Sequence, residues 1–154
     1  EKLVNMDNPN VAIANGIGMV HQHFMLVQPF TVAQNIILGV EPTKGLGSID
    51  INKAIEDVKA ISEKYGLYVD PNAKIEDISV GMQQRVEILK ALYRGAEILI
   101  LDEPTNHLDV DAKEELKRAL IEYKGSILMV CHEPEFYDGL ATDVWDCSEW
   151  TTRL

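Results

Sequence analysis

Residues 98–104 read Ile98-Leu99-Ile100-Leu101-Asp102-Glu103-Pro104. The four apolar residues predict a buried strand, and the Asp-Glu pair predicts two carboxylates at the carboxyl end of that strand. Nucleotide hydrolases use such a strand end to hold Mg²⁺ and to orient a water molecule. The phosphate-binding pattern that usually accompanies this strand, G-x-x-x-x-G-K-[ST], does not occur in the 154 residues. Taken alone, the Asp-Glu pair is explained equally well as a polar strand end that meets solvent.

The composition is that of an ordinary globular domain, with 46% hydrophobic and 25% charged residues. None of the apolar runs approaches the roughly 20 residues that cross a bilayer. The N-terminus has no basic region followed by an apolar one, so we expect no secretory signal. Cys131 and Cys147 lack metal-ligand spacing and are interpreted as reduced cysteines of a cytosolic protein. The formal net charge of −11 argues against a general nucleic-acid surface, so no direct DNA binding is expected.

Helical and strand patterns alternate along the chain. Strands are expected at residues 17–20, 97–101 and 126–131, with a further one at 143–147. Helix N-caps are expected at Asn8, at Thr31, at Asp50 or Asn52, at Ser79, and in a capping box of Asp111 with Glu114. Continuous apolar strands separated by helices predict a parallel sheet covered on both faces.

Chemistry-bearing residues stand where these elements end or begin. Gln22, Asp102 and His132 each stand at the end of a predicted strand, and Gly81 lies at the start of the helix before the second strand. Ligands of open α/β folds bind at the carboxyl edge of the sheet, so we expect these residues to gather there. Each of them alone also has an ordinary structural explanation. Their order and spacing favour one shared site.

In this order the residues resemble the nucleotide-binding domain of ATP-binding-cassette (ABC) proteins. Gln22 is similar to the Q-loop glutamine, and residues 79–83, Ser-Val-Gly-Met-Gln, are similar to the signature motif. Residues 98–102 resemble Walker B, residues 106–109 resemble the D-loop, and His132 resembles the switch histidine. The resemblance implies an α/β fold, a partial P-loop NTPase with a parallel sheet and an inserted helical signature subdomain.

The resemblance covers residues 1–154 as one partial nucleotide-binding domain. It implies a helical subdomain at about residues 24–95 and an α/β part at about residues 96–154, which carries Walker B, the D-loop and the H-loop. The Walker A loop is missing, together with its strand, so an unpaired apolar sheet edge is expected. We therefore expect the chain alone to bind and hydrolyse ATP weakly or not at all.

The family resemblance also implies ATP and Mg²⁺ as cofactors and gives individual residues roles. Asp102 would hold Mg²⁺ through water, with Gln22 as a second metal-site residue that also senses the phosphate. Glu103 would polarise the attacking water, and His132 would donate to the γ-phosphate. The residues implied to face the ATP of the opposite subunit in a head-to-tail dimer are Ser79, Gly81, Gln83 and Asp109.

Two branches of the family are represented. Residues 1 to about 104 resemble the ATPases of nucleoside and simple-sugar importers, whereas residues from about 102 to 154 resemble ABC-F proteins. The change falls at residues 102–105, Asp-Glu-Pro-Thr, a motif that both branches share. A chimera of two sequences is therefore favoured over a natural divergent protein.

The leading functional hypothesis is the ATP-binding and ATP-hydrolysing subunit of an importer. Its partners would be a second ABC domain and a membrane permease, which would hold it at the cytoplasmic face of the cell membrane. The alternatives are an ABC-F translation factor that works at the ribosome and a non-catalytic fragment or fusion. The apolar residues at positions 24, 25, 26 and 30 fit a permease docking surface and a subdomain core equally well.

Overall fold

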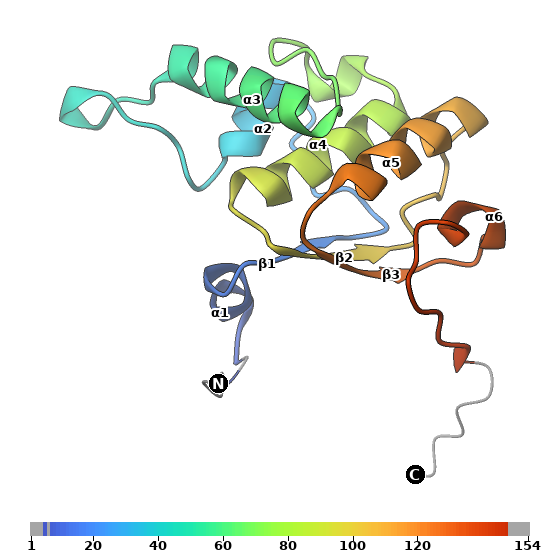
Figure 1. Cartoon of the computed structure of the whole chain (residues 1–154). Coiled ribbons are helices and arrows are strands. Elements are labelled where there is room, and N and C mark those ends of the chain that lie inside the picture. The colour runs from blue at the N-terminus through green and yellow to red at the C-terminus, as the bar shows by residue number, and fades with distance from the viewer. Residues whose placement is uncertain (1–4, 6, 148–154) are drawn as a thin grey trace.

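A computed structural model describes residue 5 and residues 7–147 (Figure 1). Its elements are α1 (Pro9–Ala14), β1 (Ile17–Val20), α2 (Val32–Ile37), a 3₁₀ turn (Gly45–Gly47), α3 (Ile51–Tyr65), a second 3₁₀ turn (Ile75–Asp77), α4 (Val80–Tyr93), β2 (Ile98–Asp102), α5 (Val110–Glu122), β3 (Ser126–Val130) and α6 (Pro134–Tyr137). Among the described residues, no helix combines the length and the apolar character needed to cross a bilayer.

The three strands form a parallel sheet in the order β1-β2-β3. Gly18 of β1 pairs with Leu99 of β2, which in turn pairs with Ile127 of β3. Parallel neighbours need a crossover connection, and α5 supplies the one between β2 and β3. The predicted α/β fold with a parallel sheet is therefore confirmed, and all three carboxyl strand ends meet at one edge.

Helix starts follow the local capping chemistry with one exception. The N-caps predicted at Asn8, Thr31, Asp50 and Ser79 form, each with a side-chain oxygen that accepts a backbone N–H. The capping box predicted for Asp111 and Glu114 was wrong. The Asp109 Oδ1 accepts the Ala112 N–H at 2.8 Å, so α5 begins two residues earlier than expected and Asp111 lies in its first turn.

The core lies between one face of the sheet and the helices α4 and α5 (Figure 1). Leu99 and Leu101 of β2 are fully buried there, together with Val86 and Leu89 of α4. Apolar side chains at alternate strand positions thus pack against apolar helix faces, the arrangement that stabilises an α/β layer.

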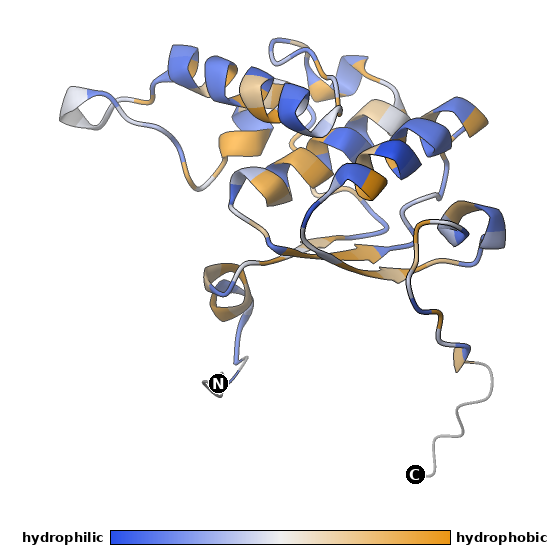
Figure 2. Cartoon of the chain, in the orientation of Figure 1, coloured by the Kyte–Doolittle hydropathy of each residue, from blue (hydrophilic) through white to orange (hydrophobic). Residues whose placement is uncertain are grey.

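The opposite sheet face corrects the expectation of a sheet covered on both faces. Met19, Ile98, Leu128 and Val130 project to that face with exposed fractions between 39% and 51%. Figure 2 shows the strands as largely hydrophobic, while α4 and α5 both lie on the other side. Strand composition predicts burial of both faces, but within the described residues helices cover only one. The outer edges of β1 and β3 have no strand partner among the described residues.

Helices α2, α3 and α4 pack against one another, and α4 also contacts β1. The signature helix α4 therefore belongs to both the helical layer and the sheet layer. The division at about residues 24–95 and about residues 96–154 stays a prediction.

The strand expected at residues 143–147 was wrong, because this segment contains no extended pairing. Val144 and Trp145 remain exposed, and no described strand lies beside them.

Candidate functional site

Glu103 occupies a sharp turn directly after β2. Its backbone N–H donates to the Val130 carbonyl at 2.9 Å and so extends the pairing between β2 and β3 by one residue. Its φ of 45° lies in the left-handed region, which costs energy for a residue with a side chain. The turn directs the chain away from the sheet towards α5 and leaves the Glu103 carboxylate at the sheet's carboxyl edge.

Three side chains converge on this carboxylate. The Gln22 Nε2 lies 3.2 Å from Glu103 Oε2, and the Asn106 Nδ2 lies 2.5 Å from the same oxygen. The His132 Nε2 lies 3.1 Å from Glu103 Oε1. The edge predicted from spacing therefore brings Gln22, Glu103 and His132 together. Asn106 was predicted only as the first residue of the D-loop motif and not as a partner of Glu103, although its position three residues after Glu103, in the turn, was a possible signal.

The described residues hold no cluster of three His, Cys, Asp or Glu side chains that would bind a metal by itself. Mg²⁺ in nucleotide sites is usually held by one or two carboxylates, with water and substrate phosphates completing the octahedron. Asp102 is half-buried at the end of β2, and Gln22 keeps a free carboxamide oxygen while its nitrogen faces Glu103. This donor set fits a magnesium site that a nucleotide completes.

A second group of predicted residues lies at helix N-termini. The Ser79 Oγ accepts the Met82 N–H at 3.3 Å and begins α4, while Asp109 begins α5. A Cβ at Gly81 would lie 3.0 Å from the Ala112 Cβ, so glycine lets the start of α4 approach the start of α5 closely. The tertiary fold thus brings the signature segment against the D-loop segment of the same chain.

Gln83 has structural partners in this arrangement. Its Nε2 donates to the Ile75 carbonyl at 3.4 Å and to the Ile78 carbonyl at 3.3 Å. Gln83 therefore fastens the 3₁₀ turn before Ser79 to the first turn of α4.

An ion pair supports the segment that follows His132. The Lys113 Nζ on α5 lies 2.6 Å from Glu133 Oε2. The hydrogen bond from Lys113 is the main reason that the pKa of Glu133 lies below its usual range, and a weaker contribution comes from a hydrogen bond with Thr105. The sequence analysis missed this contact, which links elements that are distant in sequence.

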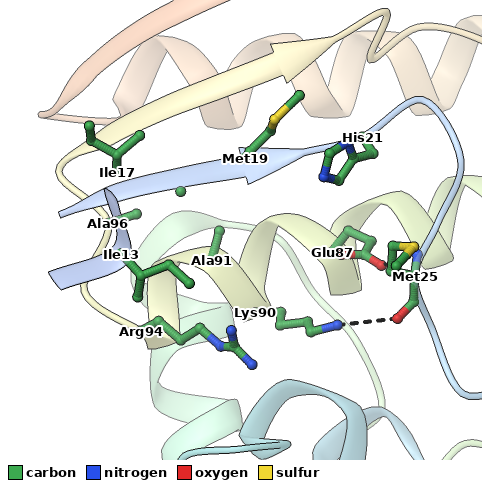
Figure 3. Close-up of a pocket in the computed structure, with 11 residues that line it drawn as sticks. Ile13, Ile17, Met19, His21, Met25, Glu87, Lys90, Ala91, Arg94 and Ala96 are labelled. Carbon is green, nitrogen blue, oxygen red and sulfur yellow. Dashed lines mark hydrogen bonds between the residues drawn. The ribbon is translucent and has the colours of Figure 1, made fainter. Parts of the chain in front are cut away.

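A pocket of about 170 Å³ lies between β1, α1 and α4 (Figure 3). Lys90 of α4 donates to the Met25 carbonyl at 3.3 Å, and the Met25 N–H donates to Glu87 Oε1 at 2.6 Å. Arg94 donates to the Leu38 carbonyl at 2.6 Å, while its buried Nε finds no partner among the described residues. The pocket thus combines apolar walls with two cationic side chains and one carboxylate, that of Glu87.

Of the apolar residues at positions 24, 25, 26 and 30, two belong to the core and two are exposed. Leu26 is buried, and Phe24 packs against the core. Met25 is 70% exposed beside the pocket, and Phe30 is also exposed.

Comparisons with known proteins give the relatives of this chain in sequence and in fold. A family model described as ABC transporter matches residues 4–106. The nucleoside import ATP-binding protein NupA of Lactococcus lactis is 53% identical over 135 residues, which cover 86% of this chain and 26% of NupA. The guanosine import ATP-binding protein NupO of Bacillus subtilis is 59% identical over 117 residues, 76% of this chain and 23% of NupO. The chain therefore spans about a quarter of the length of these curated relatives.

Among solved structures, the dimeric structure of MJ0796, a bacterial ABC transporter cassette, superposes with a TM-score of 0.65 and 24% identity. The superposition covers 84% of this chain and 59% of that chain. At this identity the likeness concerns the fold.

Proposed function

The chain belongs to the ABC transporter family, and we propose that it is part of the ATP-binding, ATP-hydrolysing subunit of a nucleoside or sugar importer. The contacts of Gln22 and His132 with the Glu103 carboxylate are the observation that carries the proposal. The names of the relatives support the substrate class, since both NupA and NupO are nucleoside-type import proteins.

ABC ATP-binding proteins use ATP with Mg²⁺, and in this proposal Asp102 and Gln22 hold the ion. When bound, the ion offsets charge on the phosphates. Glu103 accepts a hydrogen bond from the attacking water and orients it, while His132 donates to the phosphate oxygen on which charge develops. Both side chains already lie at one edge of the sheet, so they need little rearrangement to act together.

The residues at the helix N-termini serve a second nucleotide in our proposal. Ser79, the Gly81 amide and Asp109 face the ATP held by a second ABC domain in a head-to-tail dimer. A helix N-terminus presents free N–H groups and a positive dipole end, which suit a phosphate. Gln83 acts indirectly, because its carboxamide holds the turn that precedes Ser79.

The pocket beside Met25 is the proposed contact with a membrane permease at the cytoplasmic face of the membrane. Its apolar walls and the cations Lys90 and Arg94 complement a permease segment that carries a carboxylate next to apolar side chains.

The sequence has no G-x-x-x-x-G-K-[ST] loop to cradle the phosphates, so we propose that this chain alone binds MgATP weakly. Isothermal titration of the chain with MgATP tests this. We expect weak binding that Asp102→Ala removes and that Ser79→Arg leaves unchanged, because Ser79 serves the partner domain. Binding that survives Asp102→Ala contradicts the assigned site.

The dimer role has its own test. In a preparation that hydrolyses ATP, Ser79→Arg abolishes cooperation between subunits and leaves the fold intact, whereas Ser48→Arg on an exposed loop is neutral. Unchanged ATP turnover in Ser79→Arg would contradict the assignment of Ser79 to the nucleotide of the second domain.

A role at the ribosome is the second candidate, favoured by the resemblance of residues 102–154 to ABC-F proteins. Under this proposal the chain is a chimera whose two parts meet at residues 102–105, the motif that both branches share. Co-purification from cells separates the candidates. A permease in the membrane pellet supports the importer, and ribosome co-sedimentation supports the factor.

A further inference from the structure

Asn106 makes the shortest of the three contacts to Glu103. Its Nδ2 lies 2.5 Å from Glu103 Oε2, compared with 3.2 Å for the Gln22 Nε2 on the same oxygen. Its backbone N–H also donates to the Glu103 carbonyl at 3.1 Å, which closes a turn. Two hydrogen bonds, one from the backbone and one from the side chain, therefore join the same pair of residues.

The turn that presents Asn106 is anchored on both sides. Thr105 is only 3% exposed, and its carbonyl accepts the Leu108 N–H at 3.2 Å. At the other end Glu103 is joined to Val130 of β3. Asn106 itself is half-buried. The backbone of Asn106, from which its half-buried carboxamide extends to Glu103, is therefore held by contacts within the turn and the sheet.

The other two partners of the carboxylate are much less confined. The His132 side chain is 80% exposed, and Gln22 is exposed as well. Asn106 is thus the one partner of Glu103 among the described contacts that is held by both burial and backbone geometry.

The chemistry of a carboxamide suits this position. The Asn N–H₂ group is uncharged and can only donate, so it orients a carboxylate oxygen through a hydrogen bond without forming an ion pair. It binds Oε2 and leaves Oε1 towards His132. An ammonium at this place would neutralise the carboxylate, whereas Asn orients it and preserves its charge.

We infer that Asn106 is a positioning residue that fixes the Glu103 carboxylate in register with His132. The contact between Glu103 and His132 then depends on Asn106, although Asn106 does not touch His132. The catalytic meaning rests on the proposed function of Glu103, but the positioning is a property of the nucleotide-free chain.

The test is a double-mutant comparison by NMR on the full chain without nucleotide. Glu103→Gln is expected to shift the ring resonances of His132, because it removes the charge beside the imidazole. In an Asn106→Leu background, which deletes the donor at similar volume, we expect this shift to fall to less than half. An equal shift in both backgrounds overturns the inference.

Two further variants make the result specific. Asn72→Leu, on an exposed loop, is the matched control and leaves the response of His132 at its wild-type size. If Asn106→Leu fails to fold, Asn106→Ser replaces it, since the shorter hydroxyl deletes the contact with little change in packing. A wild-type response in a folded Asn106→Ser protein also overturns the inference.

ATP turnover is a separate readout that distinguishes the two proposals. Where turnover is present, Asn106→Leu lowers kcat by roughly 10²-fold with an unchanged KM, as expected for a misplaced reacting group. Loss of the His132 response in Asn106→Leu, together with MgATP binding that survives Asp102→Ala, leaves the positioning standing and rejects the function assigned to the site. An unchanged kcat with a lost response rejects Glu103 as the catalytic base.

Discussion

Asn35 holds the segment that follows Gln22 against α2, and its replacement by alanine is expected to loosen that segment. The side chain of Asn35 is fully buried. Its Oδ1 accepts the Val27 N–H at 2.7 Å, and its Nδ2 donates to the carbonyls of Val27 and Thr31, both at 3.1 Å. The Asn35 side chain thus supplies the hydrogen bonds that a neighbouring strand would give to the backbone of this irregular segment.

The size of the effect follows from what Asn35→Ala leaves unpaired. The Val27 and Thr31 carbonyls keep other donors, namely the N–H groups of Phe30 and Asn35. The Val27 N–H loses its partner, which costs about 1–3 kcal/mol in a partly buried place, and each further lost bond costs about 0.5–1.5 kcal/mol. We expect Asn35→Ala to lower the free energy of unfolding by about 2–6 kcal/mol, a large part of an ordinary domain's stability.

Urea unfolding followed by circular dichroism measures this change, with Asn72→Ala on an exposed loop as the control. Asn35→Asp separates hydrogen bonding from shape, because it keeps the acceptor but turns a carboxylate towards two carbonyls. Burial raises the pKa of the introduced carboxyl, so the folded state binds the proton more tightly than the unfolded state. The deficit of Asn35→Asp therefore shrinks as the pH falls. A cost of Asn35→Ala within about 0.5 kcal/mol of the control refutes the reasoning.

Three further substitutions test other parts of the structure. Lys113 lowers the pKa of Glu133, so Glu133→Gln is expected to lose its full share of stability above the unfolded carboxyl pKa of about 4.3. This loss disappears as the pH falls through the lower folded pKa of Glu133. Urea midpoints at a series of pH values measure the loss. Leu101→Ala empties a fully buried site beneath α4 and α5 and is expected to cost about 2–5 kcal/mol in chemical unfolding. Arg85→Met removes the ion pair with Glu115 and the hydrogen bond to the Tyr68 carbonyl, and is expected to lower the thermal midpoint, with a stability loss of about 1 kcal/mol because Glu115 is partly exposed.

Each of these has a matched control nearby. Glu135→Gln removes a charge from exposed α6 and is expected to lack the pH-dependent loss; equal curves for both glutamates contradict the ion-pair reasoning. Ile121→Ala, on the exposed side of α5, serves for the core substitution, and a cost equal to that of Leu101→Ala contradicts the assigned burial. Arg118 lines the same surface hollow as Arg85, so Arg118→Met is the control for Arg85→Met. An equal change in the thermal midpoint for both variants contradicts a stabilising role of the ion pair between Arg85 and Glu115.

Much of the local structure was predictable because its causes are local. A side-chain oxygen at Ser79 or Thr31 satisfies N–H groups within three residues, so the helix starts could be recognised from neighbouring letters. At α5 two acidic residues competed for the cap. Asp109 forms it where Asp111 was expected, because the turn after Glu103 delivers the chain to Asp109 in the extended conformation that a cap requires.

The sequence by itself determined the strands β1, β2 and β3, their parallel arrangement and the edge at which Gln22, Glu103 and His132 meet, because strand period and crossover direction follow from residue pattern. The pattern at residues 143–147 also predicted a strand, which does not form. Only the tertiary structure decided that one sheet face is exposed among the described residues, that Asp109 caps α5, and that Asn106 donates a hydrogen bond to Glu103. These outcomes depend on which groups from distant segments arrive within hydrogen-bond or packing distance. Short-range pattern cannot encode such distances, since they are fixed only when the turn after β2 closes against β3.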